Sequence, residues 1–161
     1  MGRDEDEESR AKEIVLRRLA ITARSRAELA SDLVRRGFPS DLIERILDRF
    51  TEVGLVDDAA LAVSLVSSKA RNSGWSRRAA AYRLRERGVP EDAIEMAIES
   101  VSDEEEKERA LNLVRRAWKQ LAGVDEQVRR RRITGMLARR GYSQGMATSV
   151  ILSVGEERGK T

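Results

Sequence analysis

Apolar residues along this chain recur at offsets of three and four positions, the spacing that places side chains on one face of a helix. Leu42, Ile43, Ile46 and Leu47, for example, would form the buried face of a helix over about residues 40–53. No run alternates between apolar and polar positions in the way that is typical of a strand. The pattern therefore predicts an all-α chain, which we interpret as nine helices in three triplets.

A five-residue pattern, Leu-x-x-Arg-Gly, occurs three times and organises the rest of the chain. Its copies end at Gly37, Gly88 and Gly141, which are 51 and 53 positions apart. Glycine commonly follows the last turn of a helix because it adopts a left-handed conformation without a Cβ clash. In two copies a proline, Pro39 or Pro90, comes two positions later, where a new helix begins. The regular spacing predicts three tandem three-helix, helix-turn-helix-like repeats.

The repeats and the composition together predict the boundaries of the chain's parts. The predicted parts are an acidic tail at 1–10, repeats at 11–56, 57–101 and 102–154, and a frayed C-terminal tail at 155–161. The first ten residues carry five acids and two bases, so we expect them to be disordered. This tail would either keep the protein soluble or fold back on the basic remainder of the chain.

Several helix starts are marked by their own capping residues. Ser25 with Glu28, and Ser102 with the glutamate three positions later, have the spacing of a capping box. Asp57 or Asp58 is expected to cap the helix that follows them. Paired aspartates also bind metals, but no third acidic ligand is apparent near these two, so capping is the favoured interpretation and no metal site is predicted.

The composition excludes most catalytic chemistry. The 161 residues include no cysteine and no histidine, which removes disulfides, thiolate chemistry, the commonest general base and any Ser-His triad. No glycine-rich phosphate loop is present. We therefore expect a protein that is not an enzyme and needs no cofactor. No apolar run reaches the roughly 20 residues that span a membrane, and no signal peptide is visible, so we expect a cytoplasmic monomer.

The net charge of +3 hides a more basic body, because the first ten residues contribute −3 and the rest +6. Most of the basic residues are arginines, whose planar fork of donors suits carboxylates and phosphates. An anionic partner, either nucleic acid or an acidic protein surface, is expected. We predict that arginines of the three copies, with one tyrosine, form one continuous basic strip. Its predicted members are Arg35, Arg36, Arg77, Arg78, Tyr82, Arg85, Arg87, Arg130, Arg131, Arg139 and Arg140.

Four segments in order resemble the RecX family of bacterial recombination regulators. Arg24-Ser25-Arg26-Ala27-Glu28-Leu29 is similar to the family's basic-Ser-x-x-Glu-Leu segment, and Leu33-x-x-Arg36-Gly37-Phe38 to its Leu-x-x-Lys/Arg-Gly turn. Gly54-Leu55-Val56-Asp57-Asp58 resembles its Gly-Leu-Ile-Asp-Asp segment, and Leu84-x-x-Arg87-Gly88-Val89 its middle repeat. Leu61 stands where the family usually has an aromatic ring. The third copy has Ser143 where the other copies have proline, which makes its last helix the least secure.

The resemblance implies a fold and a function. The fold would be three tandem three-helix repeats that form an elongated, curved body. The function would be non-enzymatic regulation of homologous recombination, DNA repair and the SOS response, through binding in the groove of the RecA filament on single-stranded DNA. Binding there would inhibit or modulate the ATPase, coprotease and strand-exchange activities of RecA. The partner would be RecA, with possible direct contact to DNA.

Alternatives remain for the function and for single residues. Helix-turn-helix geometry and basic side chains also allow a module that binds DNA directly, although six aromatic residues offer little base stacking. Any single arginine of the strip is either a contact residue or a solvated surface charge. Trp75 is either a packing residue or an exposed anchor.

Overall fold

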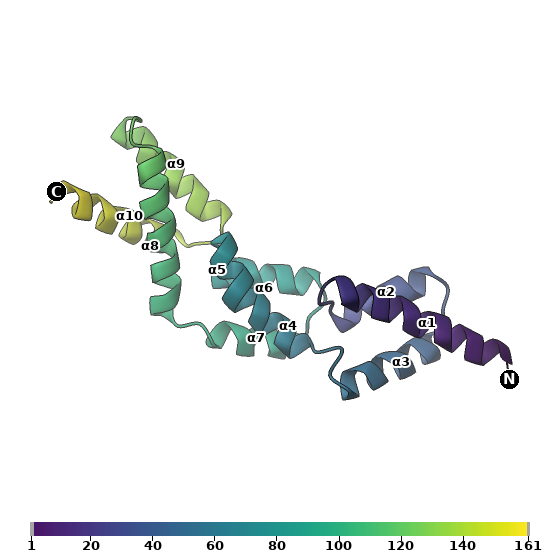
Figure 1. Ribbon diagram of the computed structural model, residues 1–161. Helices are drawn as coiled ribbons and strands as arrows, with labels where there is room; N and C mark the ends of the chain where they lie inside the picture. Colours follow the sequence, from purple (N-terminus) through teal and green to yellow (C-terminus); the bar gives the residue numbers. More distant parts are fainter. Residues whose placement is uncertain (1, 161) are drawn as a thin grey trace. The chain divides into compact units, whose positions relative to one another are not determined.

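The computed structural model describes residues 2–160, and these fold into helices without any strand (Figure 1). The prediction of an all-α chain is confirmed. Met1 and Thr161, the outermost residues of the two predicted tails, lie outside the described residues. The helices are α1 (Gly2–Ile21), α2 (Arg26–Arg35), α3 (Ser40–Glu52), α4 (Asp58–Ser64), the π-helical η1 (Leu65–Lys69), α5 (Ala70–Ser73), α6 (Arg77–Glu86), α7 (Glu91–Glu99), α8 (Asp103–Gln120), α9 (Glu126–Arg139) and α10 (Gln144–Gly159).

The elements α4, η1 and α5 follow one another without a break, so they correspond to a single predicted helix. Counted in this way, the described residues form nine helices. A buried arginine accompanies the π-helical turn: Arg109 donates hydrogen bonds to the carbonyl oxygens of Val66 and Ser67, over 3.1 and 3.4 Å. A π turn disturbs the regular bonding of a helix, and the guanidinium satisfies carbonyls there.

The described chain packs as two compact units. Unit one comprises residues 2–63 and 84–96, and unit two comprises residues 64–83 and 97–160. The chain passes from one unit to the other within α4, α6 and α7.

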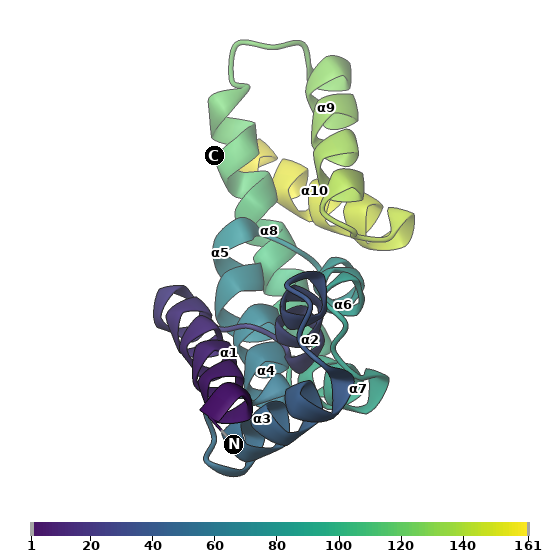
Figure 2. The same cartoon turned by 90° about the vertical axis from the view of Figure 1, so that its right-hand side faces the viewer.

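In unit one, α1, α2 and α3 enclose an apolar core (Figure 2). The largest contribution comes from α3, whose offsets of three and four place the four predicted side chains in the core, together with Phe50. Leu16 of α1 is half exposed, so the buried side of that helix is narrower than its apolar residues indicate. The buried core residues are Ala11, Val15, Leu29, Leu33, Phe38, Leu42, Ile43, Ile46, Leu47, Phe50 and Val56.

In unit two, α8, α9 and α10 pack around a second core (Figure 1). Trp118 of α8 lies in this core at 6% exposure, with the Arg129 and Arg130 guanidinium groups 5.3 and 5.5 Å from its ring centroid. The buried core residues are Ala110, Leu113, Val114, Ala117, Trp118, Ile133, Leu137, Tyr142, Ala147, Val150, Ile151 and Val154.

Both predicted tails are wrong over the residues that the structure describes. Residues 2–10 are the first turns of α1, where Glu8 pairs with Lys12 one turn on and with Arg45 of α3 over 3.6 Å. Acidic side chains near a helix N-terminus also interact favourably with the helix dipole. At the other end, Gly155 lies inside α10, and a Cβ on it would lie 2.9 Å from Nη2 of Arg130 and 3.6 Å from the Trp118 ring.

The Leu-x-x-Arg-Gly turns are built alike in the three copies. Each glycine has a positive φ, at 84° for Gly37, 73° for Gly88 and 86° for Gly141. The residue after each glycine donates its amide to the carbonyl of the repeated leucine. These three bonds are Phe38 to Leu33, Val89 to Leu84 and Tyr142 to Leu137, at 3.2, 3.1 and 3.1 Å. Local sequence therefore determines the turn in the same way each time.

The turns of the second and third copies also contact the helix start of the copy before them, and we call this contact the joint. In unit one, the Ser25 hydroxyl donates to the Arg87 carbonyl, and a Cβ on Gly88 would lie 2.5 Å from Cβ of Ala27. In unit two, the Ser76 amide donates to the Arg140 carbonyl over 2.9 Å, and a Cβ on Gly141 would lie 2.5 Å from the Ser76 hydroxyl. Glycine is thus required at both joints for close approach as well as for backbone conformation.

None of the helices described here combines the length and apolar character that crossing a bilayer requires.

Candidate binding surface

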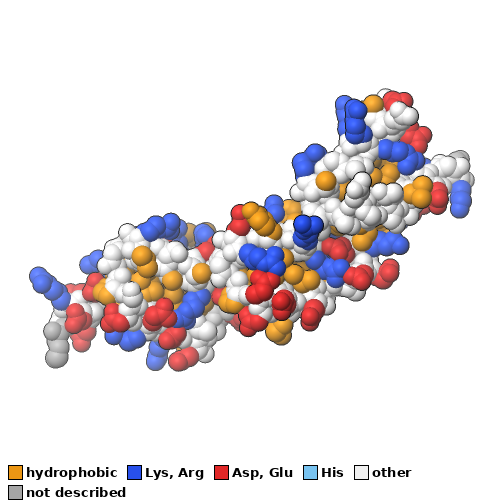
Figure 3. Space-filling view, turned by 180° about the vertical axis from the view of Figure 1, so that it is seen from behind, with side chains coloured by type: hydrophobic (Ala, Val, Ile, Leu, Met, Phe, Trp, Pro, Cys, Tyr) orange, Lys and Arg blue, Asp and Glu red, His pale blue; other side chains and the backbone are white. Residues whose placement is uncertain are grey.

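The eleven predicted strip residues are divided between the two units. Unit one contains Arg35, Arg36, Arg85 and Arg87, and unit two contains Arg77, Arg78, Tyr82, Arg130, Arg131, Arg139 and Arg140. A strip that is continuous over both units stays a prediction. In the space-filling view of Figure 3, basic and acidic side chains are interspersed within each unit. Some of these arginines pair with neighbouring carboxylates of the chain, and others have no carboxylate partner among the described residues.

Three arginines share one carboxylate at the C-terminal half of α2. Asp32 accepts from Arg18 over 3.1 Å and pairs with Arg35 and Arg36 over 3.4 Å each. Burial acts to raise the pKa of Asp32, but the contacts from Arg18 and Arg36 outweigh it and hold the pKa below its ordinary value. One negative charge facing three positive charges leaves a surplus of positive charge at this end of α2.

Arg87 and Arg85 are both engaged within unit one. The Arg87 guanidinium donates to both carboxylate oxygens of Glu28 and to the Ala23 carbonyl. Burial acts to raise the pKa of Glu28, whereas the hydrogen bonds from Arg87 and from the Ser25 amide lower it below its ordinary value. Arg85 is half exposed and donates to both oxygens of Glu91. Arg87 therefore stabilises the joint, while Arg85 is a paired surface charge.

Arg77 is also a structural residue. It donates to Glu106, to Asp103 and to the Val101 carbonyl, which ties the start of α6 to the start of α8. Its side chain is 23% exposed, and burial, which acts to lower its pKa, is outweighed by the hydrogen bonds that it donates to Asp103 and Glu106, which raise the pKa. The predicted contact role does not match the geometry of this arginine, because its donors already face carboxylates of the same unit.

One turn of α6 in unit two is free for contact. Arg78 is exposed and has no ion pair or hydrogen bond with any described residue, and Tyr82, four positions on, is 59% exposed. The neighbouring Arg83 places its guanidinium 3.8 Å from the ring centroid of Trp75. Trp75 is half-buried and one ring face is covered, so it serves as a packing partner for Arg83.

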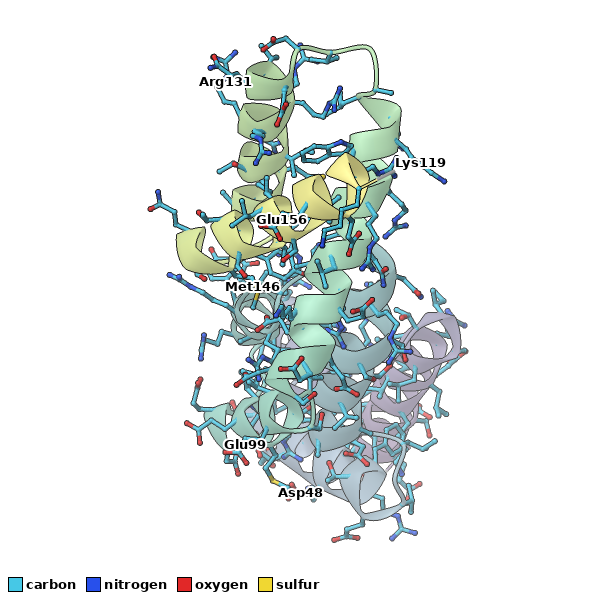
Figure 4. All side chains as sticks on the ribbon, turned by 90° about the vertical axis from the view of Figure 1, so that its left-hand side faces the viewer. Asp48, Glu99, Lys119, Arg131, Met146 and Glu156 are labelled. Atoms are coloured by element: carbon cyan, nitrogen blue, oxygen red, sulfur yellow. The ribbon has the colours of Figure 1, made fainter. Side chains whose placement is uncertain are left out.

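The four consecutive arginines at the start of α9 divide into two pairs. Arg129 donates to the carbonyl oxygens of Leu121, Ala122 and Val124, each over 2.9 Å, and so caps the end of α8. Arg130 pairs with Glu126 over 2.8 Å. Arg131 and Arg132 are exposed and make no ion pair or hydrogen bond within residues 2–160. Figure 4 shows Arg131 projecting from α9 on the opposite side of the α8–α9 pair from Lys119.

The end of α9 shows the same division. The Arg140 side chain donates to the Ser73 carbonyl over 3.3 Å, and its own carbonyl belongs to the joint. Arg139 is exposed and unpaired among the described side chains. A Cβ on Gly135 would lie 3.3 Å from Nη1 of Arg139, so this guanidinium lies back over the glycine. Glycine inside a helix costs about 1 kcal/mol relative to alanine, and here it leaves room for the arginine.

A hollow of about 370 Å³ lies between α8 and α9, and we call it the α9 hollow. The free arginines line it together with apolar side chains, and no acidic residue does. Its lining residues are Ala117, Gln120, Leu121, Arg131, Arg132, Ile133, Gly135, Met136 and Arg139. By contrast, a hollow of about 410 Å³ in unit one is lined by Arg18, Arg35 and Arg87 along with their partners Asp32 and Glu28. The α9 hollow is therefore the more electropositive of the two.

Sequence reasoning missed some residues that matter in these arrangements. Arg132 and Gly135 belong to the α9 hollow, and only two four-residue spacings, from Arg132 to Met136 and from Gly135 to Arg139, could have indicated this. Asp57 caps α4 as predicted, through the Ala60 amide over 2.9 Å. Asp58 instead accepts from the Arg26 amide at the start of α2, over 2.9 Å. Among the residues described, no cluster of acidic side chains is arranged to hold a metal ion.

Comparison with known proteins adds a family to this geometry. The first, second and third three-helix domains of RecX match residues 11–50, 57–98 and 103–151. The chain is 46% identical over 147 residues to the regulatory protein RecX of Thermobifida fusca, covering 91% of this chain and 80% of that protein. It is 43% identical over 158 residues to the RecX of Streptomyces coelicolor, covering 98% and 83%.

Solved structures show the same fold. A crystal structure of RecX from Lactobacillus salivarius superposes with a TM-score of 0.79 at 19% identity, covering 94% of this chain and 98% of that one. A second crystal structure of regulatory protein RecX gives a TM-score of 0.77 at 22% identity, covering 91% and 74%. On the sequence matches, which extend over all three domains, the chain belongs to the RecX family.

Proposed function

We propose that this protein binds the RecA filament on single-stranded DNA and thereby regulates ATP hydrolysis, coprotease activity and strand exchange by RecA. Family membership supports a regulatory role. The observation that carries the proposal is positive charge that no carboxylate of the described chain neutralises: the surplus around Asp32, and the exposed arginines Arg78 of α6 and Arg131, Arg132 and Arg139 of α9. Such forks suit carboxylates and phosphates on a partner.

Repeated weak contacts suit a repeating host. A filament offers the same surface at every subunit, and tandem repeats can contact successive subunits. Because linked contacts raise the effective concentration of one another, each contact can be weak while the total is strong. We propose that the three repeats act in this way, as a monomer, in the cytoplasm, and without catalysis.

The decisive experiment is a titration of RecA ATP turnover on single-stranded DNA with this protein. We expect inhibition that saturates and weakens with added salt, because exposed charges are screened. An Arg78→Gln, Arg131→Gln, Arg139→Gln variant should need at least tenfold more protein for the same effect. A matched Arg49→Gln, Arg71→Gln, Arg116→Gln variant loses the same charge at other exposed positions and should behave like the parent. No effect of the parent protein on turnover would contradict the proposal.

Direct DNA binding is the second candidate, and one observation favours it. The exposed Tyr82 ring lies one helical turn from the free Arg78, and an aromatic ring beside an arginine can stack on a base while the arginine contacts phosphate. Filter binding of single-stranded DNA without RecA tests this. Tight binding that falls steeply with salt and is unchanged by RecA would favour this candidate over the first.

A further inference from the structure

The α9 hollow combines unpaired positive charge with an apolar surface. Its rim has three arginines without carboxylate partners among the described residues, and its floor is apolar. Ala117 and Ile133 of the floor are buried at 8% and 0% exposure, while Leu121 and Met136 are partly buried. Solvated arginines do not require a neighbouring apolar surface, and a partly buried apolar surface does not require neighbouring arginines.

The three arginines of the α9 hollow gather on one helix without a carboxylate partner among the described residues. In the same unit, Arg77, Arg115 and Arg130 all face carboxylates. Arg131 and Arg132, by contrast, are adjacent like charges on one helix, and Arg139 lies two turns further along. Unpaired like charges repel one another, and their mutual repulsion is relieved when an anion binds between them.

The size of the α9 hollow limits what it can hold. Pockets for whole small ligands run from roughly 300 to 1,000 Å³. At about 370 Å³ the α9 hollow is near the lower end of this range, which is room for one or two side chains. The floor is aliphatic and has no aromatic ring among its lining residues. Nucleic-acid bases bind best where they stack on aromatic rings, so the floor favours an aliphatic side chain over a base.

We propose that the α9 hollow binds an acidic peptide segment of a partner protein, with one aliphatic side chain on the floor and flanking carboxylates on the arginines. Charge complementarity selects this occupant, because three guanidinium forks without internal partners match carboxylates in a bidentate geometry. Gly135 has a positioning role, since it allows the Arg139 guanidinium to lie back over the helix toward the other two. This inference does not depend on filament binding.

The test uses the full chain and a fluorescein-labelled heptapeptide of alternating glutamate and aspartate around a central leucine, followed by fluorescence anisotropy. We expect saturable binding that is at least tenfold weaker for Arg131→Gln, Arg132→Gln, Arg139→Gln. The matched variant Arg49→Gln, Arg71→Gln, Arg116→Gln should bind within twofold of the parent. A peptide with serine in place of leucine should bind at least threefold more weakly, because it cannot use the floor.

A second variant separates loss of binding from loss of folding. Gly135→Ala replaces glycine within a helix and presses a methyl group on the Arg139 guanidinium. We expect the melting temperature to hold or rise while peptide binding falls at least threefold. Equal loss in the matched control variant, or no effect of the leucine, would overturn the proposal. So would a labelled thymidine 12-mer that binds more tightly than the peptide and loses affinity in the Arg131, Arg132, Arg139 variant, since the α9 hollow would then be a nucleic-acid site.

Discussion

Arg87 and Glu28, which are 59 positions apart in the sequence, form a two-pronged ion pair with hydrogen bonds of 2.9 and 3.0 Å. The pair lies at the joint of unit one, beside the Ser25 hydroxyl bond to the Arg87 carbonyl. Both side chains are about three-quarters buried. The repeated arginine of the second Leu-x-x-Arg-Gly copy therefore holds that copy to the capping box of the first.

Replacing Arg87 by glutamine should lower the free energy of unfolding. Hydrogen bonds to charged groups contribute about 1.5–3 kcal/mol each when partly buried, and Glu28 would keep a charge without its main partner. Thermal and urea unfolding followed by circular dichroism measure the loss. Arg17→Gln breaks an exposed pair with Glu13 and should change stability little; equal losses in the two variants would contradict the assignment.

Stability should also fall at acidic pH, because Glu28 and Asp32 of unit one become protonated there. The pKa values of Glu28 and Asp32 lie below their ordinary values, against the effect of burial, because arginines contact them. A group with a lowered folded-state pKa contributes stability above its unfolded-state pKa, near about 4, and loses it as the pH falls through the folded-state pKa. Urea midpoints at pH 7, 5 and 3 should show the decline, and Glu28→Gln should flatten it.

The three glycines of the repeated turn should differ in their tolerance of alanine. All have positive φ, which costs a non-glycine residue on the order of 1–2 kcal/mol. Gly88 and Gly141 also approach the preceding copy closely, whereas a Cβ on Gly37 would meet nothing within 4 Å. We expect Gly88→Ala and Gly141→Ala to be clearly more destabilising in unfolding experiments. Equal losses of stability at all three positions would show that the joints rearrange easily to accommodate an added methyl group.

The buried guanidinium beside the π-helical turn offers another test. Arg109→Met keeps the apolar length of the side chain but removes the donors to Val66 and Ser67. Unsatisfied buried carbonyls cost about 1–3 kcal/mol each, so we expect lower stability and faster amide hydrogen exchange over residues 65–71. Arg109→Lys should recover part of the protection. Unchanged exchange in the methionine variant would mean that the turn does not depend on this side chain.

Replacing Tyr142 by phenylalanine should stabilise the protein. Its ring is in the core of unit two, its hydroxyl is buried without a partner among the described residues, and burial, together with the charge of Glu106, raises its pKa to about 12. The first copy has Phe38 at the equivalent place. Removing an unsatisfied hydroxyl should raise the free energy of unfolding by up to about 1 kcal/mol. A loss of stability in Tyr142→Phe would reveal a partner for the hydroxyl.

Short-range signals in the sequence predicted the fold well. The capping boxes at Ser25 and Ser102 and the left-handed glycines involve residues within a few positions of one another, and all are present. The tails were mispredicted because residues from elsewhere in the chain lie against them: Arg45 pairs with Glu8, and Arg130 and Trp118 lie close to Gly155.

The binding surface was harder to predict for the same reason. Arg77 and Arg78 are neighbours in sequence with similar surroundings, yet one is tied to α8 and the other is free. Which arginines have carboxylate partners depends on distant helices, so composition and spacing identify a basic chain without identifying its contact residues. The strip combined both kinds, and it omitted Arg132, which the α9 hollow contains.

The joint has a consequence for protein engineering. At Gly88 and Gly141 the helix start of the preceding copy packs against the glycine, whereas a Cβ on Gly37 would meet nothing within 4 Å. The turn of the first copy therefore makes no such joint with any described residue, whereas the other two copies each make one. A designer who fuses an additional copy upstream, with serine and a small residue at its helix start, can aim for a third joint at Gly37, built like those at Gly88 and Gly141.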